Sequence, residues 1–464
     1  MGVQQSGTDL EGRSASKQGT PWSWWACTTV LLLLAVTFGQ REYHLFTHAE
    51  QAPTPVAPDF GVYYVAGLIA RSGNGGQLYS MPPEATKAEQ ARKVVYGAVP
   101  PDTELAKVAA QTTHSHMTYY TYPPFFAWAV APLTHLKPRV AYFAWRGLST
   151  LMLLAATYLV LSSLRPNAGL GTFTVAAVGA LSFFPFSEVL YEGQVGCLIL
   201  FLWSLGFYFM QTRRTPWSAA SFATGTLVKV TPAIVVPMML LRRQWRWLVC
   251  YCMTAAALVV ASVPRVGLHP YWTYASKVFP LLSAGVEGYP LKSMGTVVRN
   301  LYLGQAVFGA ADPWQVPLLV RISISAANFG LLAIVLFYLF KNRVPNPRVL
   351  AQEFAILALV SLMISPVTWR HHYVIAVLPL LCAWLYSRES ASHQRLALMS
   401  GITLVLGTPF ADFVLVRMHP GRLQAILSSA FLLASGLLLM LCIQDHRQMA
   451  ERLPKTAPEE FFAA

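Results

Sequence analysis

Charged residues are scarce in this chain. Only 12% of its 464 residues are Asp, Glu, Lys or Arg, about half the share of about 25% found in soluble proteins. Long apolar runs alternate with short loops that hold most of the charge, and the runs are too long and too numerous for the core helices of a soluble fold. The scarcity of charge therefore excludes a soluble globular domain and predicts a polytopic integral membrane protein.

Paired cysteines and the common catalytic signatures are also missing. All six cysteines lie in apolar stretches, and none forms a CxxC pair or a Cys/His ligand set, which excludes a disulfide framework and a zinc site. The chain has no P-loop, no Rossmann GxGxxG, no HExxH and no GxSxG. Matched broken helices in two halves, typical of transporters with inverted repeats, are not visible either.

Among the charges that are present, basic residues dominate. The net charge is +14 and the pI is near 9.6. The basic residues lie singly or in pairs at the ends of apolar runs, as in Arg213-Arg214 and Arg242-Arg243, rather than along one continuous face. This placement favours the positive-inside bias and contact with anionic lipids over nucleic-acid binding. Part of the excess suits an anionic, lipid-linked substrate.

The apolar runs predict an all-α membrane helix bundle with about twelve transmembrane helices. The first run, Trp22–Gly39, follows basic residues and has no convincing cleavage site, so we expect an uncleaved anchor and a cytoplasmic N-terminus. Eleven further runs cover approximately 123–136, 140–163, 171–187, 189–211, 217–241, 245–263, 316–340, 349–366, 371–387, 395–415 and 423–443. Some are short enough to be re-entrant.

These runs predict one transmembrane domain over residues 21–444. Residues 1–20 predict a disordered cytoplasmic tail, and residues 445–464 a second cytoplasmic tail. The stretch of about 41–121 predicts a large outer loop with helical segments around Glu84–Tyr96 and Asp102–Thr113. Within it, the apolar segment Asp59–Arg71 is too short to span and is typical of an interfacial helix lying on the membrane.

Ionisable groups in or beside apolar spans need a reason, because each costs roughly 2.5–3.5 kcal/mol at the bilayer centre. Asp59 opens the interfacial helix, where a helix N-cap and a catalytic carboxylate are both possible and compatible. Lys229 lies deep in an apolar run beside Pro232, which breaks or kinks the helix. A snorkelling lysine is the alternative, but a lysine beside a helix break favours a polar cavity that accepts an anion.

Other polar residues form short motifs at the ends of spans. Trp369-Arg370-His371-His372-Tyr373 begins a run, and its two histidines can donate to phosphate oxygens, although an interfacial aromatic belt is the simpler alternative. Tyr191-Glu192-Gly193-Gln194, which reads alone as a polar turn, and Tyr122-Pro123-Pro124 interrupt the apolar sequence elsewhere. Arg146 and Arg299 are weaker candidates.

Together these motifs resemble glycosyltransferase family 87, the membrane-embedded polyprenyl-phosphomannose-dependent mannosyltransferases with the GT-C fold. The resemblance covers roughly residues 55–375, and its motifs occur in family order. They are Asp59-Phe60 with Tyr63-Tyr64, Tyr122-Pro123-Pro124, Glu192-Gly193-Gln194, Lys229 with Thr231-Pro232, and Ser365-Pro366-Val367-Thr368-Trp369-Arg370-His371-His372. Each motif is short, and the specificity comes from their order.

The resemblance implies a multi-pass enzyme of a bacterial plasma membrane that transfers a hexose, best known as mannose, from a polyprenyl phosphate to a lipid or glycan hydroxyl on the outer face. It implies Asp59 as general base of an inverting reaction. The expected donor-phosphate ligands are His371, His372, Lys229, Arg146 and Arg299, and the expected sugar or acceptor ligands are Tyr63, Tyr122, Glu192, Gln194 and Trp369. No cofactor and no tight metal site are expected, although a need for a divalent metal stays open.

The residues are also compatible with two other functional hypotheses. A transporter or lipid flippase would also place Lys229 and histidines in a polar membrane cavity, but it would form no glycosidic bond. A non-catalytic membrane assembly factor would tolerate Asp59→Asn without loss of function.

Overall fold

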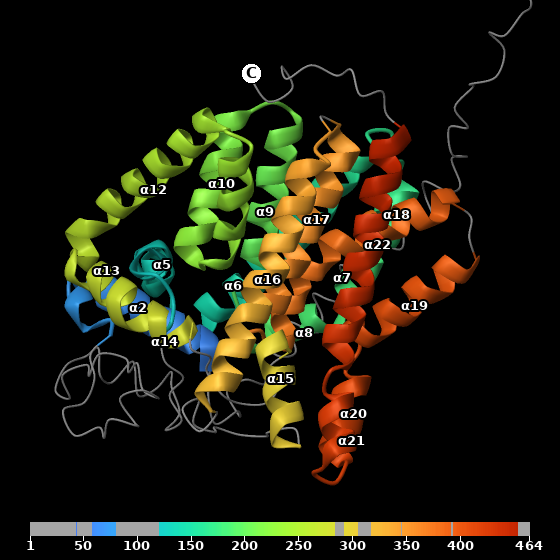
Figure 1. The fold of residues 1–464 in the computed structure, drawn as a ribbon. Coiled ribbons are helices and arrows are strands. Elements are labelled where there is room, and N and C mark those ends of the chain that lie inside the picture. Colours follow the sequence, from blue (N-terminus) through green and yellow to red (C-terminus); the bar gives the residue numbers. More distant parts are fainter. Residues whose placement is uncertain are drawn as a thin grey trace, which may run out of the picture.

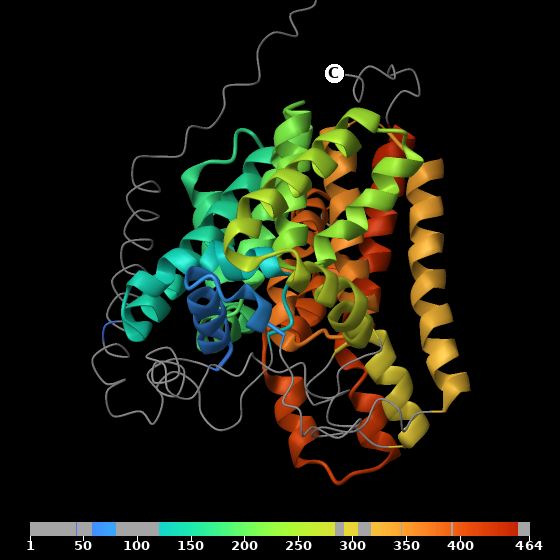
Figure 2. The same cartoon turned by 90° about the vertical axis from the view of Figure 1, so that its left-hand side faces the viewer.

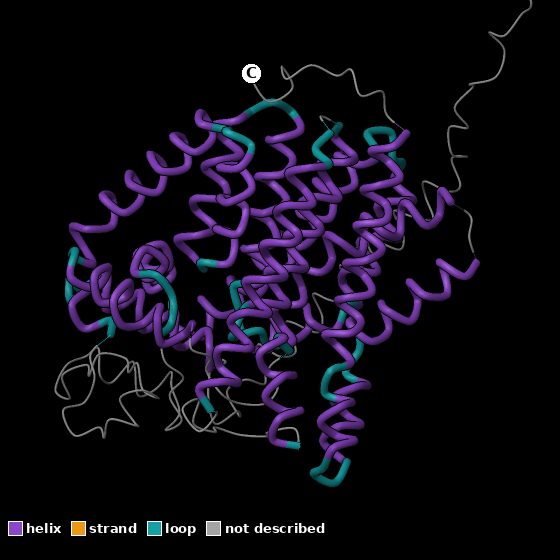
Figure 3. Tube along the Cα trace, in the orientation of Figure 1, coloured by secondary structure: helices purple, strands orange, loops and turns teal. Residues whose placement is uncertain are grey.

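The structure is a computed structural model that describes Tyr43 and residues 58–79, 120–283, 292–304, 317–344, 346–390 and 393–452. All regular structure in these ranges is helical, and no strand occurs in them (Figure 3). The helices form a bundle whose axes run mostly between the two ends shown at the top and bottom of Figure 1. The predicted all-α class is confirmed.

Four helices in the described ranges are long and apolar enough to cross a membrane. They are α6 (Pro138–Leu164), α12 (Trp245–Val266), α16 (Leu318–Lys341) and the continuous pair α21–α22 (Arg422–Arg452). Two bent pairs raise the number to as many as six. The pair α7 (Leu170–Ser182) and α8 (Phe184–Glu192) bends by 57°, and the pair α19 (His393–Gly407) and α20 (Phe410–Arg417) bends by 59°.

The expected count of about twelve spans is not confirmed, because several apolar runs fold as shorter pieces. The run at 217–241 forms α10 (Thr215–Val228), an extended Lys229, the 3-10 helix η4 (Thr231–Ile234) and α11 (Val235–Leu241). This confirms the break predicted at Pro232, whose ring and missing N–H disrupt the helix. The run at 123–136 likewise divides into α5 (Pro124–Val130) and the 3-10 helix η3 (Ala131–His135).

The centre of the bundle is built from helices that are far apart in sequence. The helix α9 (Gly196–Gln211) packs against α6 and α10, while α17 (Pro347–Ile364) packs against α18 (Val377–Ser390) and α22 (Ala430–Arg452). By contrast, α12 and α16 stand at the flanks, and only 11% of the most apolar window of each is buried (Figures 1 and 2). Their exposed apolar faces are the surfaces that a lipid bilayer would cover.

Short helices gather at the end of the bundle drawn at the bottom of Figure 1. They are α2 (Pro58–Arg71), η2 (Gly75–Gln77), α13 (His269–Thr273), the π-helical turn η5 (Tyr274–Val278), α14 (Phe279–Ser283), α15 (Met294–Leu303) and the hairpin of α20 with α21 (Arg422–Leu427). The 3-10 helix η7 (Arg370–Ala376) joins α17 to α18 and packs against α8 and α9. Among these elements, α2 carries Asp59 and Tyr63, α15 carries Arg299, and η7 carries His371 and His372.

The segment predicted as an interfacial helix is helical, as α2, but it does not present an open face. Every residue from Phe60 to Ala70 is buried, because α2 packs against α5 and η3. A helix covered on all sides by protein holds its first-turn carboxylate, Asp59, in a more fixed position than a helix floating on the membrane surface.

Other predictions lie at or beyond the edge of the described residues. The anchor Trp22–Gly39, the tail 1–20 and the helical segments Glu84–Tyr96 and Asp102–Thr113 all lie outside them. At the other end, α22 continues to Arg452, past the point at which a polar tail is predicted to begin.

Candidate active site

The structure brings Asp59 and Gln194 together across 135 residues of sequence. Asp59 lies in the first turn of α2, and the Gln194 side-chain amide donates a hydrogen bond to its Oδ2. Gln194 follows the end of α8 and is buried, with 6% of its surface exposed. The amide therefore holds one oxygen of the carboxylate at a defined place.

Two tyrosines determine which way the Gln194 amide faces. Its Oε1 accepts from the hydroxyls of Tyr63 and Tyr122, each at 2.9 Å, and the two hydroxyls are 2.7 Å apart. Burial, and then the nearby Asp59 carboxylate, raise the pKa of the Tyr122 phenol, so this hydroxyl keeps its proton. Because the carbonyl faces the phenols, the NH₂ group must face Asp59.

Gly193 makes the approach of α8 to α2 possible. It ends α8 in the left-handed conformation, with φ of +70°, which glycine adopts without steric cost. A Cβ atom at this position would be 2.5 Å from the Phe60 Cβ and 3.3 Å from the Tyr142 ring. Any larger residue would separate the helix end from α2 and move Gln194 away from Asp59.

Lys229 reaches the same site from the break between α10 and η4. Its Nζ lies 5.7 Å from the centroid of the Tyr122 ring, and it is close enough to Asp59 for an electrostatic interaction. The Lys229 Nζ also contacts the Nε2 of His372. The extended backbone at Lys229, with φ of −154° and ψ of 131°, directs this residue out of the helix.

The contact between Lys229 and His372 puts two side-chain nitrogens next to each other. The Nδ1 of His372 accepts from the backbone N–H of Trp369 at 3.0 Å, and its Nε2 faces the Lys229 Nζ. A charged lysine and an imidazole N–H are both donors, so an anionic oxygen beside this contact can accept hydrogen bonds from both groups.

His371 supplies a further buried nitrogen beside this pair. Its ring lies 4.4 Å from that of His372 at 84° and stacks on the Trp369 indole at 6.3 Å and 8°. The His371 Nε2 is buried and has no hydrogen-bond partner in the described structure. Because it lies beside Lys229 and His372, this nitrogen is available to a ligand bound at the same place.

The arrangement thus has two chemically distinct sides. A carboxylate held by an amide lies on one side, and a lysine with two histidines lies on the other, with Tyr122 contacting both. A carboxylate can take a proton from a hydroxyl, and convergent donors in a buried place stabilise an oxygen that gains negative charge. Group transfer away from a phosphate needs both functions at once.

Comparison with known proteins agrees with this chemistry. The sequence profile of glycosyltransferase family 87 matches residues 120–366, which is more than half of the chain. The chain belongs to glycosyltransferase family 87. Within the matched stretch lie Tyr122, Glu192, Gln194 and Lys229, whereas Asp59 and the two histidines lie outside it, so their place in the site rests on geometry.

Two curated relatives are mannosyltransferases. The chain is 26% identical over 313 residues to the polyprenol-phosphate-mannose-dependent alpha-(1-2)-phosphatidylinositol mannoside mannosyltransferase of Mycolicibacterium smegmatis, and the match covers 62% of this chain and 67% of the relative. It is 25% identical over 312 residues to the protein of the same name from Mycobacterium tuberculosis, covering 62% and 68%. Both are similar to this family 87 chain over about two thirds of their own length.

The remaining candidate residues fall at different distances from the centre of the site. Glu192 ends α8 and interacts electrostatically with Asp59. Arg146 is buried in α6, where its Nη1 donates to the carbonyl of Leu190 at 2.7 Å and to the Tyr142 hydroxyl at 3.0 Å. Arg146 therefore supports the end of α8. Arg299 lies in α15, which packs mainly against α16 and α21.

Two charged residues near the site were missing from the sequence-based candidates. Lys292 and Asp412 are buried and form an ion pair, and Asp412 also pairs with Arg370. Asp412 could have been noticed, since it is the only acidic residue in the apolar run 395–415 and such residues are costly in a membrane. In the described ranges, no three His, Cys, Asp or Glu side chains come together as a metal site.

Proposed function

We propose that this family 87 protein transfers a mannosyl group from a polyprenyl phosphate to a hydroxyl of a lipid or glycan acceptor. The observation that carries the proposal is that Tyr122 links the two sides of the site. Its hydroxyl donates to Gln194, which holds Asp59, and its ring lies 5.7 Å from the Lys229 Nζ. The relatives named above use polyprenol-phosphate mannose as donor, which supports mannose as the sugar.

In this proposal Asp59 is the general base. As the acceptor oxygen attacks the anomeric carbon from the face opposite the phosphate, its proton passes to Asp59, a bond to the acceptor oxygen forms and the bond to the phosphate oxygen breaks. The sugar configuration is inverted. Gln194 keeps the carboxylate in place, and the negative charge of Asp59 favours the positive charge that develops on the sugar ring. Glu192 is assigned to the hydroxyls of the sugar or the acceptor.

Lys229, His371 and His372 receive the departing phosphate. The phosphate gains negative charge as the bond breaks, so donors already fixed at that place lower the barrier more than they strengthen donor binding. This assignment gives the unpaired His371 Nε2 a partner and places the phosphate beside the contact between Lys229 and His372. Tyr63, Tyr122 and Trp369 are then placed to contact the sugar or the acceptor.

The fold suits substrates that stay in a membrane. The exposed apolar faces of α12 and α16 border the bundle, and a polyprenyl tail can lie along such surfaces while its phosphate enters the site. The relatives act on a phosphatidylinositol mannoside by name, which supports a lipid acceptor here. We place the reaction at the outer face of a bacterial plasma membrane, as the sequence predicts for the loop that contains Asp59.

The deciding experiment incubates purified protein with several polyprenyl-phosphate sugars and a mixture of membrane lipids, without an ion gradient. We expect release of polyprenyl phosphate and a new glycolipid with the mannosyl donor. A transporter or flippase would move the donor across vesicles without forming either product, and that result would reject the proposal.

Asp59→Asn tests the base directly. We expect transfer to fall at least about 100-fold, the usual range for loss of a general base, while the melting temperature stays near that of the wild type. Glu451→Gln, which changes an exposed carboxylate of α22, is the control. Full activity of Asp59→Asn would favour the assembly-factor reading.

A further inference from the structure

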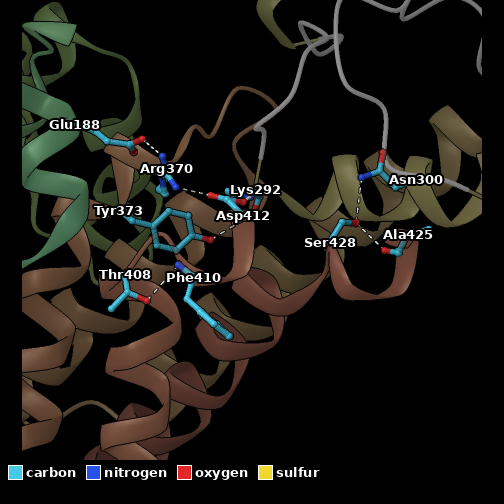
Figure 4. Close-up of polar contacts among 10 residues, drawn as sticks. All are labelled: Glu188, Lys292, Asn300, Arg370, Tyr373, Thr408, Phe410, Asp412, Ala425 and Ser428. Carbon is cyan, nitrogen blue, oxygen red and sulfur yellow. Dashed lines mark hydrogen bonds and ion pairs between the residues drawn. The ribbon is translucent and has the colours of Figure 1, made fainter. Parts of the chain in front are cut away.

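Four charged residues beside the active site form one continuous chain of ion pairs. Arg370 contacts Glu188 of α8 with its Nη2 and Asp412 of α20 with its Nη1, the latter at 2.8 Å. Asp412 also contacts the Nζ of Lys292, which precedes α15. Figure 4 shows Arg370 between the two carboxylates, with Lys292 on the far side of Asp412. We call Glu188, Arg370, Asp412 and Lys292 the ion-pair chain.

The ion-pair chain is electrically balanced and largely withdrawn from solvent. Two carboxylates face two cations, and the exposed fractions of the Lys292 and Asp412 side chains are 2% and 8%. Arg370 precedes His371 directly in sequence, so it is an obvious candidate for a phosphate ligand. Its guanidinium is instead held by two carboxylates, which would repel a phosphate placed beside them.

The same residues enclose the segment that carries the histidines. The Lys292 backbone N–H donates to the Thr368 carbonyl at 2.6 Å, and the Tyr373 hydroxyl donates to the Lys292 carbonyl at 3.3 Å. Lys292 thus holds the chain on both sides of His371 and His372. Asp412 completes a closed circuit of contacts around the two histidines, because it links the Lys292 side chain to Arg370, the first residue of η7.

Further packing fixes Lys292 and Tyr373 themselves. The Lys292 Nζ lies 4.8 Å from the centroid of the Phe431 ring, and the same ring meets Tyr373 at 5.2 Å in an edge-to-face contact. Ser435 of α22 donates to the Tyr373 hydroxyl at 3.1 Å. The ring of interactions around the histidines is therefore anchored on α22 as well as on α8 and α20.

We propose that Asp412 is a positioning residue for the phosphate site, acting through Arg370 and Lys292 to hold His371 and His372 in place. The inference rests on the proposed function, in which these histidines receive the departing phosphate. It assigns a role to Asp412 and Lys292, and it makes Arg370 a support of the site rather than a ligand of the phosphate. Asp412 touches no reacting atom in this scheme.

Asp412→Asn separates this role from a simple effect of charge. The substitution removes one negative charge near the phosphate site, so an electrostatic effect alone would strengthen donor binding and raise the rate. Loss of positioning predicts the opposite sign: donor kcat/KM falls at least tenfold, mainly through kcat, and the acceptor KM changes less than twofold. The matched control is Asp445→Asn, which breaks another buried ion pair, between Asp445 in the C-terminal half of α22 and Arg395 of α19.

Two further variants keep the test decisive if Asp412→Asn folds poorly. The double variant Asp412→Asn/Lys292→Met restores the charge balance but does not restore the link between residue 292 and Arg370. We therefore expect its kcat/KM to stay at least tenfold below that of the wild type. Asp412→Glu keeps the charge and the ability to pair, and we expect it to retain at least a third of the wild-type rate. Wild-type kinetics in the double variant would overturn the proposal.

Hydrogen exchange gives a readout that does not depend on activity. In full-length protein in detergent, we expect Asp412→Asn to speed amide exchange at least tenfold in residues 365–376, with α17 unchanged. Unchanged exchange in 365–376 would overturn the positioning role even if activity falls. If residues 365–376 exchange more slowly in the wild type than in Asp412→Asn but the wild type transfers no sugar, the proposed function fails while the positioning of the histidines stands.

Discussion

Two buried polar clusters at opposite ends of the bundle differ in how their charges are matched. At the end away from the candidate site, the Arg242 guanidinium donates to both oxygens of Glu353 at 2.6 and 2.8 Å and to the Leu339 carbonyl at 3.3 Å. His446 contacts the same carboxylate at 3.4 Å, and its other ring nitrogen lies 3.0 Å from the Tyr338 hydroxyl. We call this the Glu353 cluster.

At the candidate site, the Lys229 cation is not matched by a carboxylate in an ion pair among the described residues. The Lys229 Nζ faces the Nε2 of His372, and the His371 Nε2 has no hydrogen-bond partner in the described structure. In the Glu353 cluster, both carboxylate oxygens are paired with Arg242 within the protein, and the contacts hold α11, α16, α17 and α22 together. In the proposed function, an anion completes the set formed by Lys229, His371 and His372. Burial of charge alone therefore does not distinguish the two clusters, whereas the pairing of charges within the protein does.

The largest effect is expected from a substitution that breaks the Glu353 cluster. Glu353→Gln leaves the buried Arg242 without its counter-charge, so we expect the free energy of unfolding to fall by about 3–5 kcal/mol. Thermal or denaturant unfolding in detergent would measure this. Glu451→Gln, in the exposed pair with Arg447 on α22, should cost less than about 1 kcal/mol. Equal losses would show that the two clusters do not differ in the way described.

Lys229→Met should lower the activity without lowering the stability of the protein. We expect transfer to fall about 100- to 1,000-fold, as when a donor to a developing charge is removed. The melting temperature should stay the same or rise, because the variant relieves a buried cation of its desolvation cost. Steady-state kinetics with the polyprenyl-phosphate donor would measure the first effect. Lys341→Met, at the exposed end of α16, is the control and should change neither property.

Gly193→Ala tests the close approach that places Gln194. The left-handed backbone costs a residue with a Cβ about 1–2 kcal/mol, and the new atom would collide with Phe60. We expect Gln194 to move away from Asp59 and transfer to slow roughly tenfold. A tenfold loss of rate corresponds to an activation free energy higher by about 1.4 kcal/mol. Gly179→Ala, where a Cβ meets no neighbour, should leave the rate unchanged, and equal rates for both variants would contradict the role of Gly193.

The smallest effect is expected for Tyr63→Phe. Removing one neutral hydrogen bond to Gln194 should cost about 1 kcal/mol, which slows transfer about fivefold without altering expression. Tyr64→Phe removes a hydroxyl that donates to the Leu136 carbonyl at 2.8 Å, outside the Asp59 site, and should leave kcat unchanged. A larger loss in Tyr64→Phe than in Tyr63→Phe would argue against the orientation of Gln194 described above.

Much of the site was predictable from local sequence. A lysine beside Pro232, two adjacent histidines after a proline and a Gly-Gln pair between apolar runs are all visible without a fold, because each violates the rule that apolar spans exclude polar residues. The helix at Asp59–Arg71 was predictable for the same local reason. Its burial was not, because the residues that cover it come from α5 and η3.

The number of spans was harder to predict than their existence. Apolar runs show that a segment avoids water, but a broken helix and a straight one have similar composition. The pairs α7–α8 and α19–α20 bend by 57° and 59°, and their short second halves place Glu188 and Asp412 beside Arg370. The position of such a bend depends on how the two helices pack against the rest of the bundle.

Local sequence is enough to predict a helical membrane protein, the break in one helix, and the polar residues that need an explanation. Which cations are already paired depends on the folded chain. Arg146 and Arg370 are as conspicuous in sequence as Lys229, but the carbonyl and the carboxylates that pair with them lie 44, 182 and 42 residues away in the chain. Pairing of charges depends on distances in space, which local sequence does not contain.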